Sequence, residues 1–210
     1  ACSMKHRYLV ISTHSDDAEV SMGGTISKLT TMGHDVKLLV CIIPCEDKDG
    51  DKIPDGLQTR LQYQTNAANI LNAEVSVLNM DPYDFAFART YVKRIDKEIK
   101  EYRPTAVFTQ WNHDSHQDHQ SIANITFAAT RKNNVSVLMY EQLTLGGITP
   151  YSFNSHVYMD ISDVINKKLA SVEQYKFLPA ADVEAVEALA RFRGNQIGVK
   201  YAECFEICKV

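Results

Sequence analysis

The chain has 210 residues, which suits one well-buried domain better than two. Its 45% hydrophobic and 23% charged residues are ordinary for a soluble globular protein. The formal net charge of −4 argues against a broad nucleic-acid-binding face, and no apolar run approaches the roughly 20 residues that span a bilayer. Because no signal-peptide pattern follows the N-terminus, we expect a cytoplasmic protein without membrane insertion. Residues 1–3, ahead of Met4, are set aside as an expression remnant.

Alternating strand and helix patterns run along the chain. In chain order we predict strand 8–12, helix 22–32, strand 36–43, helix 60–71, strand 75–78, helix 91–102, strand 106–110, helix 120–131, strands 135–140 and 156–159, helices 164–175 and 183–193, and strand 201–208. This alternation predicts an α/β fold, a Rossmann-like three-layer sandwich with a mostly parallel central sheet. No linker or internal repeat divides residues 1–210, so we expect a single domain.

The five cysteines, at positions 2, 41, 45, 204 and 208, have no export signal before them and are expected to be reduced. Two pairs, 41/45 and 204/208, raise the alternative of a four-thiolate zinc site. Both pairs lie in or beside apolar strand-like runs rather than in tight knuckles, so we favour core packing.

Ligands of open parallel sheets bind at the carboxyl ends of the strands, and two polar clusters follow strands here. The first follows the first strand, where residues 14–19 read His-Ser-Asp-Asp-Ala-Glu. A histidine beside two carboxylates is costly unless a cation or a proton relieves the like charges. The alternative is that Ser12, Thr13 or Asp16 only caps the next helix while His14 is exposed.

The second cluster follows the fourth strand and holds three histidines and two aspartates within residues 113–119. His116 and His119 are three apart at a predicted helix start and can face the same side. One can bind a metal while the other points to the reacting group, and Asp118 can fix an imidazole tautomer. The alternative is a solvated polar loop with a helix cap.

Two histidines and one carboxylate leave a metal with open positions, as in catalytic zinc sites. Non-haem Fe(II) oxygenases use a similar set of ligands, so the residues alone do not name the metal. A nucleotide-binding turn at Gly23 and Gly24 is a further alternative, although the spacing of a dinucleotide fingerprint is absent and the histidines stay unexplained.

At these residues the sequence resembles the LmbE-like, or PIG-L-like, family of zinc-dependent de-N-acetylases. The first family signature, His-Pro-Asp-Asp followed by Gly-Gly-Thr, corresponds to residues 14–17 and 23–25, and the second, His-x-Asp-His, to residues 116–119. Residues 191–198 (Arg-Phe-Arg-Gly-Asn-Gln-Ile-Gly) and 201–203 (Tyr-Ala-Glu) resemble the end of bacterial members. The resemblance therefore spans nearly the whole chain.

The resemblance implies a Zn²⁺ ion, one per chain, with another divalent metal such as Fe²⁺ as the alternative. Its ligands would be His14, Asp17 and His119, and Asp16 would be the general base. Ser15 stands where the family has proline, which costs this turn some rigidity but changes neither the ligands nor the base.

The remaining implied roles belong to His116, Asp118 and Arg60. His116 would stabilise the oxyanion or act as an acid, Asp118 would orient His116, and Arg60 would contact the substrate. The expected activity is metal-dependent deacetylation of an N-acetylglucosamine-type sugar or conjugate, a small molecule, with release of acetate. A zinc amidase acting on another amide or acyl conjugate is the runner-up. Loops 46–56 and 146–154 are candidate substrate rims, and the sequence leaves a homo-oligomer open.

Overall fold

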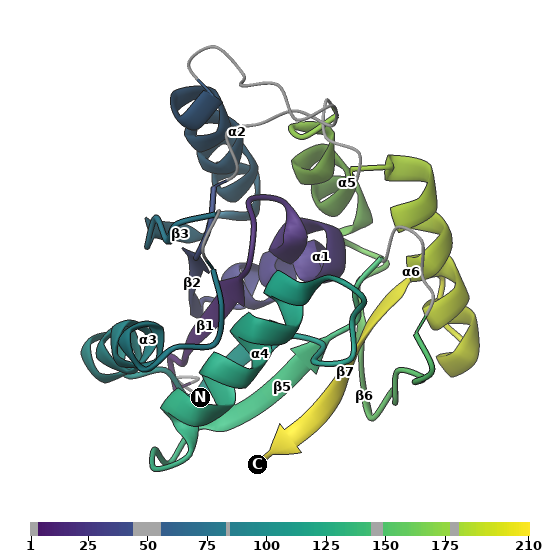
Figure 1. The fold of residues 1–210 in the computed structure, drawn as a ribbon. Coiled ribbons are helices and arrows are strands. Elements are labelled where there is room, and N and C mark those ends of the chain that lie inside the picture. The colour runs from purple at the N-terminus through teal and green to yellow at the C-terminus, as the bar shows by residue number, and fades with distance from the viewer. Residues whose placement is uncertain (1–3, 44–55, 83–84, 144–148, 177–180) are drawn as a thin grey trace.

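The computed structural model describes residues 4–43, 56–82, 85–143, 149–176 and 181–210, which form seven strands and six helices (Figure 1). The strands are β1 (Arg7–Ser12), β2 (Asp35–Val40), β3 (Glu74–Val77), β4 (Ala106–Gln110), β5 (Ser136–Tyr140), β6 (Val157–Asp160) and β7 (Ala202–Lys209). The helices are α1 (Asp17–Thr31), α2 (Gly56–Leu71), α3 (Arg89–Tyr102), α4 (Gln117–Thr130), α5 (Ile165–Glu173) and α6 (Val183–Ile197).

All seven strands form one sheet in the order β3-β2-β1-β4-β5-β7-β6. The first five strands are parallel to one another, and β7 runs antiparallel to both β5 and β6. This confirms the predicted α/β fold with a mostly parallel sheet. The strand order reverses between β1 and β4, which places the ligand-binding crevice of such sheets there.

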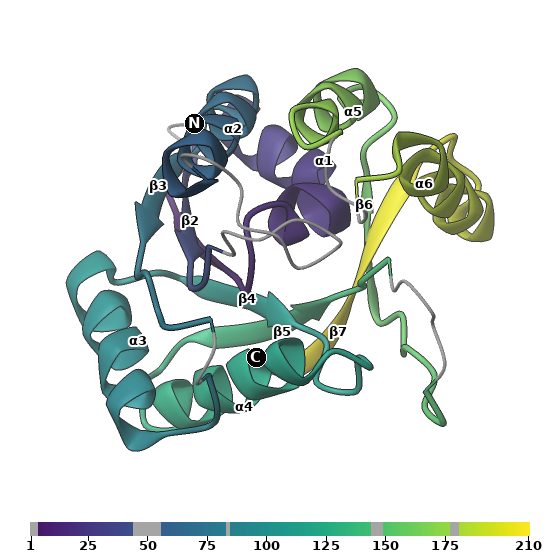
Figure 2. The ribbon, with the colours of Figure 1, turned by 45° about the horizontal axis from the view of Figure 1, so that its top comes forward.

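Helices cover both faces of the sheet, as Figure 2 shows: α3 and α4 lie on one face and α1, α2, α5 and α6 on the other. The central strands β1, β2 and β4 read largely as apolar runs because they are buried on both faces, whereas the edge strands β3 and β6 are only partly buried. In β1, Leu9 and Ile11 pack in the core with α3 and α4, whereas Val10 packs with α1 and α2. Within the described ranges, no helix combines the length and apolar content needed to cross a bilayer.

The sheet order bears on the four-thiolate alternative. Cys41 follows β2 and Cys204 lies in β7, with β1, β4 and β5 between those two strands. Four strand spacings separate them by about 19 Å, far beyond the reach of one metal ion. Cys41 and Cys204 are buried free thiols, as core packing predicts, but Cys208 is exposed, because the end of β7 is not covered, and the prediction is wrong there. Cys2 and Cys45 lie outside the described residues.

Helix α1 begins at Asp17, five residues earlier than predicted, and is kinked at Met22, where the backbone leaves helical geometry (φ −138°, ψ 22°). The second half begins with Gly23 and Gly24, and α1 approaches Ile161 closely there. A Cβ built on Gly24 would lie 2.6 Å from Ile161 Cδ1 and 2.8 Å from its Cβ. Glycine is therefore required at position 24 by packing.

We expect Gly24→Ala to lower the free energy of unfolding by about 1–3 kcal/mol, the usual cost of overpacking a core. Gly23→Ala is the matched control, because a Cβ at position 23 would lie 3.3 Å from its nearest neighbour, Cγ of the flexible Lys168 side chain. Urea denaturation of both variants measures the difference. Equal losses in the two variants would contradict the assigned role of Gly24.

Candidate metal centre

The two polar clusters meet at the carboxyl ends of β1 and β4, where the strand order reverses. The turn after β1 supplies His14, Asp16 and Asp17, the last being the first residue of α1. The loop after β4 supplies His116, which is the N-cap of α4, and His119 in its first turn. Segments about 100 residues apart in sequence therefore form one site.

His14, Asp17 and His119 place three ligand atoms in a compact triangle, here called the donor triangle. His14 Nδ1 lies 3.3 Å from His119 Nε2, and Asp17 Oδ2 lies 3.5 Å and 3.4 Å from those two atoms. A tetrahedral zinc site with ligand distances of about 2.0–2.1 Å has edges of about 3.3–3.4 Å. The donor triangle therefore has the size that such an ion requires. Among the described residues, it is one of two groups of side chains whose ligand atoms lie close enough together to hold a metal ion.

The other ring nitrogen of each histidine in the donor triangle faces a carboxylate. His14 Nε2 lies 3.1 Å from Asp118 Oδ2, and His119 Nδ1 lies 2.8 Å from Asp114 Oδ2. A metal-ligating imidazole commonly donates its free N–H to a carboxylate, which fixes its tautomer and orientation. Each histidine is thus held with its remaining ring nitrogen, Nδ1 of His14 and Nε2 of His119, in the donor triangle.

These outer partners differ from the sequence expectation. Asp118 was expected to orient His116, but its carboxylate bonds His14, and only its backbone N–H bonds His116 Nδ1. Asp114 had no predicted role, although it is buried and holds His119. Its position in the same loop, five residues before a predicted ligand, is the one sequence signal that pointed to it.

The three groups of the donor triangle shift one another's pKa values. Burial lowers the pKa of His14, but hydrogen bonds to Asp118 and Asp17 outweigh it and raise that pKa to about 9. Burial also lowers the pKa of His119, but the charge of Asp17 and the hydrogen bond to Asp114 outweigh it and raise that pKa to about 10. Burial would raise the pKa of Asp17, yet His119 and His14 hold it well below its usual value. Binding a divalent cation here must therefore displace ring protons.

Asp16 lies between β1 and α1 with φ at 116°, a left-handed backbone that non-glycine residues rarely adopt. Such backbone conformations cost of order 1–3 kcal/mol and cluster at functional sites. The side chain is buried, and burial together with the charge of Asp17 raises its pKa well above its ordinary value. Its neighbour Ser15, the residue in place of proline, is also buried.

His116 lies beside the donor triangle but outside it. Its ring centroid is 4.7 Å from that of His119, nearly parallel to it, and 5.0 Å from that of His14. Burial and the neighbouring charge of His119 lower the pKa of His116. With Asp118 and His14, it also forms the second group of possible ligand atoms.

Arg60 is placed in the first turns of α2 and is buried. One turn later, Gln64 Nε2 donates to Glu19 Oε1 of α1 over 2.6 Å, so this face of α2 is turned toward α1. The contact of Arg60 with substrate stays a prediction. The expected rim loop 46–56 lies outside the described residues except for Gly56, as do residues 146–148 of the second.

The nucleotide-binding alternative conflicts with the contacts at Gly24. The backbone N–H groups of Gly24 and Thr25 donate to the Glu203 carboxylate over 2.9 Å and 2.6 Å. Lys168 Nζ pairs with the same buried carboxylate at 2.5 Å. The N–H groups that would cradle a phosphate are therefore occupied by a carboxylate of β7.

A mostly parallel α/β sheet with two histidines and a carboxylate at its switch point defines a candidate metalloenzyme of the Rossmann-like class. The chain belongs to the PIG-L family, described as GlcNAc-PI de-N-acetylase, which it matches over residues 9–130. The matched stretch contains both polar clusters.

Similar proteins are known in sequence and in structure. Diacetylchitobiose deacetylase of Thermococcus kodakarensis is 28% identical over 222 residues, 94% of this chain and 81% of that protein. N,N'-diacetylchitobiose deacetylase of Pyrococcus horikoshii superposes with a TM-score of 0.82 at 21% identity, covering 97% and 84% of the two chains. The 4-carboxy-2-hydroxymuconate hydratase GalB of Pseudomonas putida superposes with a TM-score of 0.86 at 18% sequence identity, covering 99% of this chain and 97% of that protein. One fold thus carries different reactions, and the reaction must be argued from the site.

Proposed function

We propose that the chain is a zinc-dependent hydrolase that removes the acetyl group from an N-acetylglucosamine-type amino sugar or conjugate and releases acetate. The observation that carries this proposal is the donor triangle, whose edges suit tetrahedral zinc and whose histidines are each backed by a carboxylate. Membership of a de-N-acetylase family and the likeness to a diacetylchitobiose deacetylase support the acetamido sugar as substrate class.

The proposed ligands are His14, Asp17 and His119, which together leave a coordination position open. When bound there, zinc supplies Lewis-acid polarisation of a water molecule and of the acetyl carbonyl. Asp16, adjacent to the ligand Asp17, accepts the proton of the attacking water.

His116 lies beside the donor triangle, with its ring against those of His14 and His119. In the proposal it donates a hydrogen bond to the oxyanion, the kind of interaction that contributes about 3 kcal/mol to the transition state. Asp118 holds His14 in its ligating tautomer, and Arg60 contacts the polar groups of the sugar. The described strands form one sheet, and the described helices pack on it or, for α5, on α1 and α2, which supports treating the chain as one catalytic domain.

The proposal is tested by metal analysis together with acetate release from N-acetylglucosamine and diacetylchitobiose, each with and without a chelator. We expect about one zinc per chain and acetate release that the chelator abolishes and added zinc restores. A panel of other acyl amides is the matched control. Zinc without acetate release from any sugar, but with hydrolysis of another amide, would replace deacetylation with amidase action. Absence of bound metal in protein never exposed to chelator would overturn the metal assignment.

A further inference from the structure

The two carboxylate oxygens of Asp17 have different partners. Oδ2 belongs to the donor triangle and also accepts the backbone N–H of His14 over 2.7 Å, whereas Oδ1 accepts a hydrogen bond of 2.9 Å from Gln142 Nε2. The opposite end of this amide is also fixed, because Ser21 Oγ donates to Gln142 Oε1 over 2.8 Å. Ser21 is one turn after Asp17 on α1, so the helix that supplies the ligand also orients the amide that holds it.

The segment that carries Gln142 is itself anchored. Glu141, the preceding residue, forms a two-pronged ion pair with Arg193 of α6, through Nε to Oε2 at 2.8 Å and through Nη2 to Oε1. Cys204 Sγ of β7 donates to the same carboxylate over 3.1 Å. One residue earlier, Tyr140 donates its hydroxyl to the Ile11 carbonyl of β1 over 2.9 Å. Residues 140–142 are thus held by side-chain contacts with four other elements, β1, α1, α6 and β7.

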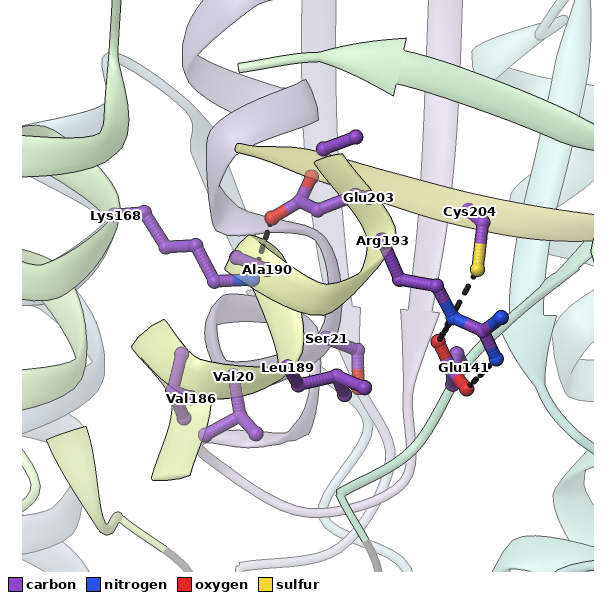
Figure 3. A pocket seen from close by; sticks show the side chains of 11 residues that line it. Val20, Ser21, Glu141, Lys168, Val186, Leu189, Ala190, Arg193, Glu203 and Cys204 are labelled. Atoms are coloured by element: carbon purple, nitrogen blue, oxygen red, sulfur yellow. Dashed lines mark hydrogen bonds and ion pairs between the residues drawn. The ribbon is translucent and has the colours of Figure 1, made fainter. Parts of the chain in front are cut away.

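Figure 3 shows Arg193 and Glu141 paired at the wall of a small cavity, with Ser21 nearby and the Lys168–Glu203 pair on another wall. The cavity has a volume of about 10 Å³, which is at the lower limit for a single water molecule.

A neutral amide is a suitable partner for a carboxylate that must bind a cation. An arginine or lysine at position 142 would neutralise Asp17 and weaken its attraction for a metal ion. The Gln142 amide instead satisfies Oδ1 with one N–H, so that Oδ2 stays aimed at His14 and His119 with its charge intact. Outer partners of metal ligands usually act in this way.

We propose that Gln142 is a positioning residue of the metal centre, which orients the ligand Asp17 and is held by Ser21 and by the Arg193–Glu141 pair. This rests on the proposed function, because it takes Asp17 as a metal ligand. Nothing in the sequence pointed to position 142, since the contact depends on the approach of the segment after β5 to the start of α1.

The first test is Gln142→Met, which keeps the side-chain volume and removes both amide hydrogen bonds. We expect zinc affinity to fall about 10- to 100-fold, measured by competition with a chromophoric chelator. At saturating zinc, KM for the acetylated sugar should stay unchanged, and the visible spectrum of the Co²⁺-substituted protein should shift. Gln64→Met is the matched control, because Gln64 also donates to a buried carboxylate of α1, that of Glu19.

Two further variants separate positioning from general destabilisation. Ser21→Ala should weaken zinc binding in the same direction, whereas Ser27→Ala, at a serine that is also buried on α1, should not. As a single substitution, Arg193→Met should weaken zinc binding. Combined with Gln142→Met, it should lower zinc affinity little further, because both residues act through the same segment. Circular dichroism and thermal melting confirm that each variant is folded.

Two outcomes overturn the inference in distinguishable ways. Wild-type zinc affinity and an unchanged Co²⁺ spectrum in folded Gln142→Met would remove Gln142 from the metal centre and leave the proposed function standing. Failure of the unaltered protein to bind zinc or cobalt would overturn both proposals together.

Discussion

Asp16→Asn should retain zinc and lose about 100- to 10,000-fold in kcat, the range that general base catalysis contributes. The amide keeps the size of the side chain and cannot accept the proton of the attacking water. Asp16 directly precedes the proposed ligand Asp17 and is held in a strained backbone conformation, with φ at 116°. Acetate release under saturating substrate and zinc measures the loss, with elemental analysis confirming the metal.

Glu19→Gln is the matched control for this variant. Glu19 is a buried carboxylate on the same helix, but its partners are Gln64 and Tyr175 rather than the donor triangle. The same chemical change there should leave kcat within about threefold, well short of the loss expected at Asp16. Near-normal turnover of Asp16→Asn with full zinc occupancy would assign the base to another group.

His119→Ala should abolish stoichiometric zinc binding and, with it, acetate release. The variant loses one vertex of the donor triangle and leaves Asp114, its buried partner, without the imidazole. We expect zinc affinity to fall by more than about 100-fold, because changing an outer partner alone typically costs 10- to 100-fold. Equilibrium dialysis followed by elemental analysis measures the change.

His113→Ala is the control for His119→Ala. It lies in the same loop, but its ring stacks on Tyr151, with centroids 4.0 Å apart, and it belongs to neither group of possible ligand atoms. Its zinc content should match that of the unaltered protein. Full occupancy in folded His119→Ala would remove His119 from the ligand set and direct attention to the second group, His14 with His116 and Asp118.

The end of the chain contributes to the site from a distance. Arg193, within the stretch that resembles bacterial family members, anchors Glu141 next to Gln142. Glu203 accepts the N–H groups at the kink of α1, and so supports the helix that begins with Asp17. Arg193 and Glu203, which lie in the C-terminal segments that resemble the family, therefore stabilise α1 and the segment that contacts its ligand Asp17.

Sequence pattern alone determined the order of the strands and helices, the mostly parallel sheet and the edge at which the two clusters meet, but it placed the starts of α1, α2 and α4 three to five residues too late. These features follow from apolar runs, helical periodicity and chain order, which are local properties. The candidate ligands His14, Asp17 and His119 were also readable, because the strands they follow end at the same edge and the family signatures contain them.

Only the tertiary structure decided which partner each side chain meets. The Asp118 carboxylate bonds His14 and only its backbone N–H bonds His116, Asp114 holds His119, and Gln142 reaches Asp17 from a segment 125 residues away. Hydrogen bonds depend on distances of a few tenths of an ångström and on side-chain direction, which spacing along the chain does not define. The outer partners of the metal centre, unlike its ligands, therefore become visible only once β1, β4 and β5 stand side by side.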